Sequence, residues 1–221
     1  LYALDQLGLS AGDAVVVERA EHAFAALAAG VVVAFVALDG TVVHPDGRVS
    51  GVTTDFAVRD AHVRLASDLA DIPLVRAEGR LRYRDEGGVT EASGKRLSLQ
   101  TGDGMSLAPT DFFLRLEDRR GSAPARGEFV ASQLDLDVLS RLAERLPFAP
   151  ALRQRLAAFA PAGNVAPLSV KWSTAADELA SYTVDARFVR LGIEPVGAWP
   201  GFSGLSGRIE GTERGGRFSL T

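Results

Sequence analysis

The sequence predicts a mainly β protein built around a large antiparallel sheet. Apolar residues recur at every second position in four runs: "RLRYR" at 80–84, "DFFLRLED" at 111–118, "LSVKWST" at 168–174 and "SYTVDARFVRL" at 181–191. This alternation gives each strand one apolar and one polar face, which is typical of antiparallel sheets with one solvated side. Sequences rich in Gly and Asp separate the runs, and one region alone has a helical period.

The alternation also assigns side chains to the apolar face. From the strand period of two, we predict that this face is formed by Leu81, Tyr83, Phe112, Leu114, Leu116, Leu168, Val170, Trp172, Tyr182, Val184 and Phe188. Turns are predicted at "HPDGR" (44–48), "DEGG" (85–88), "TGDG" (101–104) and "ERGG" (213–216).

A pair of short helices interrupts the strands at about 135–160. Leu136, Leu139, Leu142 and Leu146 follow helical spacing, with Asp135 or Asp137 as the N-cap and Pro147 as the stop. Pro150 suits the first turn of a second helix, which carries Leu152, Leu156 and Phe159 on one face and ends at Pro161. We therefore expect strand-rich parts at 1–132 and 164–221, with the helical pair inserted between them.

The glycine-rich stretch "PGFSGLSGRIEGTERGG" at 200–216 invites comparison with a phosphate-binding loop. Such a loop needs a Gly-x-Gly turn that leads into a helix, whereas here a strand-and-turn pattern follows. "GRIEGTERGG" at 207–216 aligns without gaps to "GRLRYRDEGG" at 79–88. We interpret both as hairpins of a repeated module rather than as a ligand site.

The composition excludes several kinds of site. The net charge of −4 argues against nucleic-acid binding, and the absence of Cys excludes disulfides and thiolate metal sites. The three histidines, His22, His44 and His62, form no metal-ligand pair, and no Gly-x-Ser-x-Gly motif supports a nucleophile. We expect no enzymatic activity, no cofactor and no metal site.

The apolar face leaves two architectures open. Two short helices are too small to cover a sheet of about ten strands, so the sheet either folds into a closed sandwich or curls into a trough with a dry interior. The apolar stretch Ala23–Leu38 is predicted to be a buried strand or a helix followed by a strand, because it is shorter than the roughly 20 residues of a membrane span. The chain begins at Leu1 without a Met and ends within an alternating run, so we expect one segment, 1–221, of a larger protein.

Four features of the second half occur together in order: the leucine-rich helix ending at Leu146-Pro147, "AFAPAGNV" at 158–165, the Trp172 strand and "PGFSGLSGRIEGTERGGRF" at 200–218. Through this ordered set the second half of the chain resembles the YhdP family of AsmA-like proteins of Gram-negative bacteria. The first 130 residues fit more loosely, through "ADIPLVRAEGRLRY" at 70–83.

The resemblance implies a long, strongly twisted sheet bent into a U-shaped groove, part of a protein that spans the periplasm from an inner-membrane anchor upstream. It implies that phospholipid acyl chains move along the apolar groove toward the outer membrane, and it supplies no catalytic residues. The apolar-face residues named above are then groove-lining candidates. The alternatives are a non-enzymatic periplasmic β-sandwich that acts as a scaffold or interaction protein and, less favoured, a glycan- or lipid-modifying enzyme.

Overall fold

The computed structural model describes residues 42–43, 49–65, 69–119, 124–146, 150–175 and 178–221. Two predictions, the turn at 44–48 and the stretch Ala23–Leu38, lie outside these residues, as do His22 and His44. The strands are β1 (Val42–Val43), β2 (Val49–Val63), β3 (Ile72–Glu86), β4 (Val89–Thr101), β5 (Ser106–Glu117), β6 (Ala125–Ala131), β7 (Leu134–Asp135), β8 (Ala162–Ala175), β9 (Glu178–Ile193), β10 (Phe202–Thr212) and β11 (Gly215–Leu220), and the helices are α3 (Leu136–Ala143) and α4 (Pro150–Phe159).

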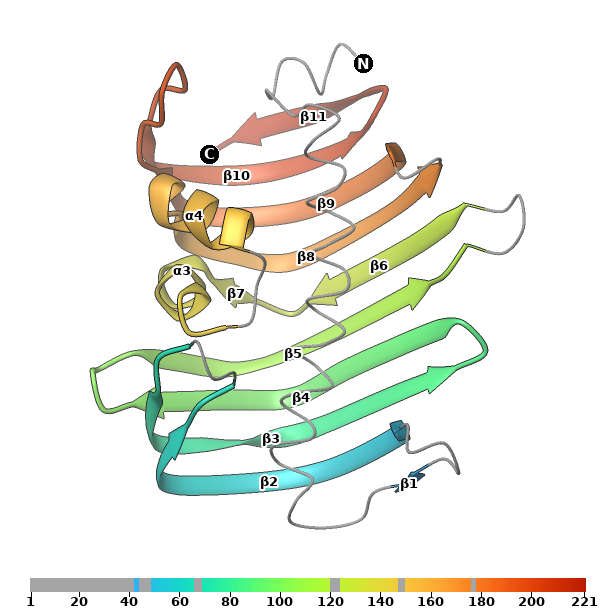
Figure 1. Ribbon diagram of the computed structural model, residues 1–221. Helices are drawn as coiled ribbons and strands as arrows, with labels where there is room; N and C mark the ends of the chain where they lie inside the picture. The colour runs from blue at the N-terminus through green and yellow to red at the C-terminus, as the bar shows by residue number, and fades with distance from the viewer. Residues whose placement is uncertain (1–41, 44–48, 66–68, 120–123, 147–149, 176–177) are drawn as a thin grey trace.

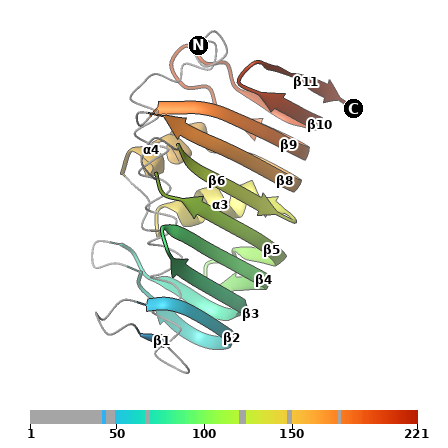
Figure 2. The same ribbon diagram turned by 90° about the vertical axis from the view of Figure 1, so that its right-hand side faces the viewer.

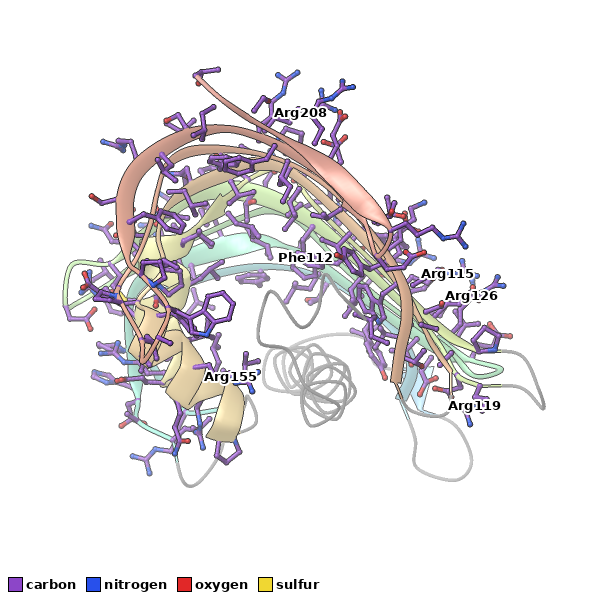
Figure 3. All side chains as sticks on the ribbon, turned by 90° about the horizontal axis from the view of Figure 1, so that it is seen from above. Phe112, Arg115, Arg119, Arg126, Arg155 and Arg208 are labelled. Atoms are coloured by element: carbon purple, nitrogen blue, oxygen red, sulfur yellow. The ribbon has the colours of Figure 1, made fainter. Side chains whose placement is uncertain are left out.

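All the described strands belong to one antiparallel sheet, which is not closed into a barrel. Its order is β1-β2-β3-β4-β5-β6-β8-β9-β10-β11, and the short β7 pairs with β8 off this path. The strands lie side by side in nearly sequential order (Figures 1 and 2), and the sheet is bent into an arch when it is seen from above (Figure 3). The prediction of a curled antiparallel sheet is therefore confirmed, and the described strands do not divide into the two sheets of a sandwich.

Bulges recur along the sheet and account for its bend. The register shifts on β4 between Gly94 and Leu97 and on β10 between Phe202 and Leu205. A residue with positive φ lies within each shift, Arg96 at 49° and Gly204 at 74°. An extra residue in one strand increases the local twist and bends the strand, so repeated bulges curve the whole sheet.

The hairpin module is present in both places, with different turn positions. The β3–β4 turn is formed by Gly87 and Gly88, whose φ angles of 59° and 72° suit a tight hairpin. In β10–β11 the turn residues are Glu213 and Arg214, because Thr212 pairs with Gly215. The ungapped alignment of the two motifs thus misplaces the second turn by two residues.

The helical pair is present, with α3 shorter than predicted. Asp135 is the N-cap, and its carboxylate accepts a hydrogen bond from the Val138 N–H at 3.0 Å. The helix ends at Ala143 rather than Leu146, because a 3₁₀-type turn follows it. In this turn the Arg145 N–H donates to the carbonyl of Leu142, three residues earlier, at 2.8 Å. α4 begins at Pro150 and ends at Phe159, as predicted.

The helix α3 covers one end of the sheet through an apolar cluster. Its buried residues are Val138, Leu142 and Ala143, so Leu142 is the one predicted leucine that is fully buried, while Leu146 packs partly buried against the same cluster. Val138 and Leu142 pack with buried side chains of β3 and of the β4–β5 turn, which include Met105 at 2% exposure. An ion pair holds the helix end to the same turn: Arg145 Nη2 lies 2.6 Å from Asp103 Oδ2. The pKa of the Asp103 carboxyl is lowered by the Thr101 hydroxyl first and by Arg145 second.

Candidate functional site

The register of the sheet aligns apolar side chains from successive strands into three rows on one face. Residues that pair directly in an antiparallel sheet point to the same side of it, so the rows can be read from the pairings. Row 1 is Val52, Tyr83, Ala92, Leu114, Phe129, Val170, Val184 and Gly211. Row 2 is Thr54, Leu81, Gly94, Phe112, Ala131, Leu168, Ala186, Ile209 and Phe218. Row 3 is Leu116, Gly127, Trp172 and Tyr182.

The structure brings the eleven candidate residues together on this face. Ten of them belong to the three rows, and Phe188 lies two residues beyond Ala186 on β9, where its ring stacks on that of Phe218 with centroids 5.5 Å apart. Phe112 lies on the inner side of the arch (Figure 3). Five of the eleven are buried, namely Leu81, Tyr83, Leu114, Leu116 and Phe188, and the other six are half-buried. The rows therefore form the concave face of the sheet.

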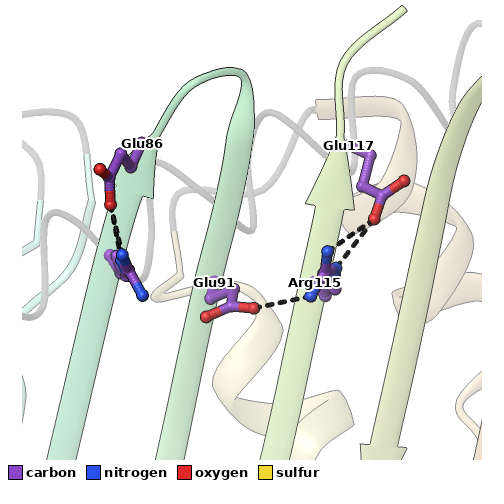
Figure 4. A network of polar contacts seen from close by, with 5 residues as sticks. Glu86, Glu91, Arg115 and Glu117 are labelled. Carbon is purple, nitrogen blue, oxygen red and sulfur yellow. Dashed lines mark hydrogen bonds and ion pairs between the residues drawn. The ribbon is translucent and has the colours of Figure 1, made fainter.

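The opposite, convex face is charged, and many of its charges are paired. Paired positions alternate in sign along one row from β3 to β8, formed by Arg84, Glu91, Arg115, Glu128 and Lys171. Arg115 lies 3.0 Å from Glu91 and 2.8 Å from Glu117, and Figure 4 shows this network beside Glu86. Arg115, Arg126 and Arg208 lie on the outer side of the arch (Figure 3).

The arginine-rich segment of β3 belongs to this convex face. Its strand lies inside the sheet, between β2 and β4. Arg80 makes two hydrogen bonds to Asp55, at 2.7 and 2.8 Å. These bonds lower the pKa of the Asp55 carboxyl. Paired charges of both signs do not make the single-sign patch that nucleic acids require.

Polar groups on the concave face gather near the strand ends. Burial raises the pKa of the Tyr83 phenol, and the nearby Asp85 carboxylate raises it further. Asp85 and Thr90 pair next to the β3–β4 turn, at the row 3 end of the strands. The concave face is thus apolar along its rows and polar toward this end.

Within the described residues, no group of three or more His, Asp or Glu side chains is placed to hold a metal ion. His62 lies on β2, exposed. In the same part of the chain, no helix has the length and apolarity needed to cross a membrane. The glycines Gly201, Gly204 and Gly207 lie at the start of β10 and within it, and a strand rather than a helix follows them.

Comparison with known proteins connects this sheet to a family. The model of the family described as "YhdP protein" matches residues 36–221 of the 221-residue chain. The chain belongs to the YhdP family. This is a lipid-transport family of the bacterial envelope, with members that are not known as enzymes. No match was found among curated proteins or among solved structures. In this YhdP-family chain the matched region contains every strand of the concave face.

Sequence patterns missed several members of the rows in this YhdP-family chain. Val52 and Ala92 are buried row 1 residues, and Ile209 belongs to row 2 on β10. Gly94 and Gly127 occupy row positions without a side chain, so no hydrophobic pattern could mark them. The pairings with flanking strands are the signal that identifies all of them.

Proposed function

We propose that this chain is a segment of a bridge-like lipid-transport protein that carries phospholipids between the inner and outer membranes, with the acyl chains lying along the concave face. The observation that carries the proposal is the continuity of the rows: each successive strand places an apolar or small residue at the position that pairs with the previous member of the row. Family membership supports the same function.

The dimensions of the rows support this proposal. Row 1 runs from β2 to β10, seven steps between neighbouring strands. At about 4.8 Å per step this corresponds to roughly 34 Å. The hydrocarbon of one membrane leaflet is about 15 Å thick, half of a bilayer core of about 30 Å. One row is therefore long enough to contact an acyl chain over its whole length.

The energetics favour sliding over fixed binding. Each buried methylene contributes about 0.8 kcal/mol, so a chain along a row is held firmly. Neighbouring steps of a row present similar apolar groups, so a shift by one strand exchanges similar contacts for one another. Head groups would remain at the polar ends of the strands, where Asp85 and Thr90 lie. This is transport without bond chemistry, and the proposed protein is not an enzyme.

The remaining parts of the proposal concern the surroundings of the segment. We place it in the periplasm, held to the inner membrane by an anchor upstream of this chain. The rival function is a β-sandwich scaffold with protein partners. The single curved sheet of the described residues favours the lipid conduit over this rival.

Lipid mass spectrometry tests the proposal. The intact protein, purified from cells without detergents that strip lipid, should carry phospholipid in amounts that scale with protein. A cytosolic β protein purified in the same way is the control for adventitious lipid. Protein that carries no more phospholipid than this control would contradict the proposal.

A further inference from the structure

An aromatic ring occupies the space above a glycine at two places on the concave face. At Gly127, a Cβ atom would lie 2.0 Å from Cζ2 and 2.1 Å from Cε2 of Trp172, which pairs with it across β6 and β8. At Gly94, a Cβ atom would lie 2.6 Å from Cε1 of Phe112, its partner on β5. Carbon atoms do not approach so closely, so each ring lies over its glycine because no side chain is there.

Backbone conformation does not explain the glycine at position 127. Its φ angle is not positive, unlike those of Gly79, Gly163 and Gly204. An L-residue can adopt the backbone of Gly127 without strain. The close approach of the indole is therefore the structural reason for glycine at this position.

The flat ring affects the depth of the concave side. Trp172 is half-buried and packs against the cluster of Leu114 and Leu116. A side chain at position 127 would lift the indole from β6, and the ring would then project toward the space above row 3. The row 3 end of the strands is the polar end, where head groups remain in the proposed function.

We propose that Gly127 shapes the acyl-chain path: it keeps row 3 deep enough for a chain because it lets Trp172 lie flat on β6. This inference rests on the proposed function. Gly94 and Phe112 repeat the arrangement in row 2, where a Cβ atom on the glycine would also lie 2.3 Å from Cδ1 of Leu97. Gly127 and Gly94 thus both leave room for an aromatic ring on the concave side.

Photo-crosslinking in cells tests the inference with the intact protein. A photo-reactive phenylalanine replaces Tyr182, which pairs with Trp172 in row 3, and phospholipid adducts are quantified. We expect Gly127→Val to lower the adduct yield by about tenfold, the effect of about two methylenes that lose their contact. Gly127→Val/Trp172→Leu should restore most of the yield, because the lifted ring is removed. The control is Arg126→Val, an exposed neighbour on the convex face, which should leave the yield unchanged.

The outcomes separate this inference from the proposed function. No adduct in the protein with Gly127 intact contradicts the proposed function itself. An unchanged yield in folded Gly127→Val, or a double variant as low as the single one, overturns the inference alone. If Gly127→Val does not fold, Gly127→Ala carries the test, since one methyl group already displaces the ring. Trp172 fluorescence in a Trp199→Phe background gives a lipid-independent readout: its emission should shift in Gly127→Val, and an unshifted spectrum would overturn the inference.

Discussion

Replacing Leu114 by Asp is expected to unfold the sheet. Leu114 is 3% exposed and lies at the centre of row 1, between Ala92 and Phe129. The substitution loses about 1.5–3 kcal/mol of apolar burial and buries a carboxylate that has no cationic partner in its row. The sum is expected to exceed about 5 kcal/mol, comparable to the whole stability of an ordinary domain.

Urea denaturation followed by circular dichroism measures this effect, with two variants for comparison. Leu114→Ala should destabilise by about 2–5 kcal/mol, as other buried leucines do. Arg115→Gln changes the adjacent residue on the convex face and removes ion pairs that are partly exposed to solvent, so it should cost less than about 1 kcal/mol. If Leu114→Asp were as stable as Arg115→Gln, position 114 would not face the core of the sheet.

The second large effect is expected on lipid content rather than on folding. Val184 is half-buried in row 1, between Val170 and Gly211, so an Asp there keeps access to solvent and the fold survives. A carboxylate in the row would have to lose its water when an acyl chain lies over it. We expect Val184→Asp to lower the phospholipid that co-purifies by at least about tenfold.

The adjacent residue gives a matched control. Thr183 is exposed on the convex face, opposite Lys171, so Thr183→Asp adds the same charge next to a cation. This variant should keep the lipid content of the unmodified protein, as measured by mass spectrometry on equal amounts of folded protein. Equal lipid loss in both variants would mean that charge, and not the face on which it lies, determines lipid content.

The alternating pattern of the sequence was enough to assign faces but not to align strands. Phe112 and Leu168 can each be assigned to an apolar face from their own strands. Their common row depends on Ala131, which pairs with both and has too small a side chain to reveal the register. The role of Gly127 depends in the same way on Trp172, a residue of another strand.

Local sequence signals predicted where some helices and strands begin or end, but not all of them. The N-cap of α3 could be narrowed to Asp135 or Asp137, because a short acidic side chain precedes a helical run, and the structure has Asp135 there. Pro150 could be assigned to the start of α4 because its ring suits a first turn. The end of α3 was misplaced by a few residues. The predicted turn at 213–216 contains the β10–β11 turn residues Glu213 and Arg214, but the alignment of the two hairpins places that turn two residues too late. In both, backbone pairings that the sequence does not encode locally determine where the element ends.

The most direct test of the central claim is a photo-crosslinking scan along β8 in the intact protein. A photo-reactive residue is placed in turn at 168, 170 and 172, in the rows, and at 169, 171 and 173, on the opposite face. The proposed lipid path predicts phospholipid adducts at the three even positions and none above background at the three odd ones. Adducts of equal yield at both sets, or at neither, would contradict transport along the concave face.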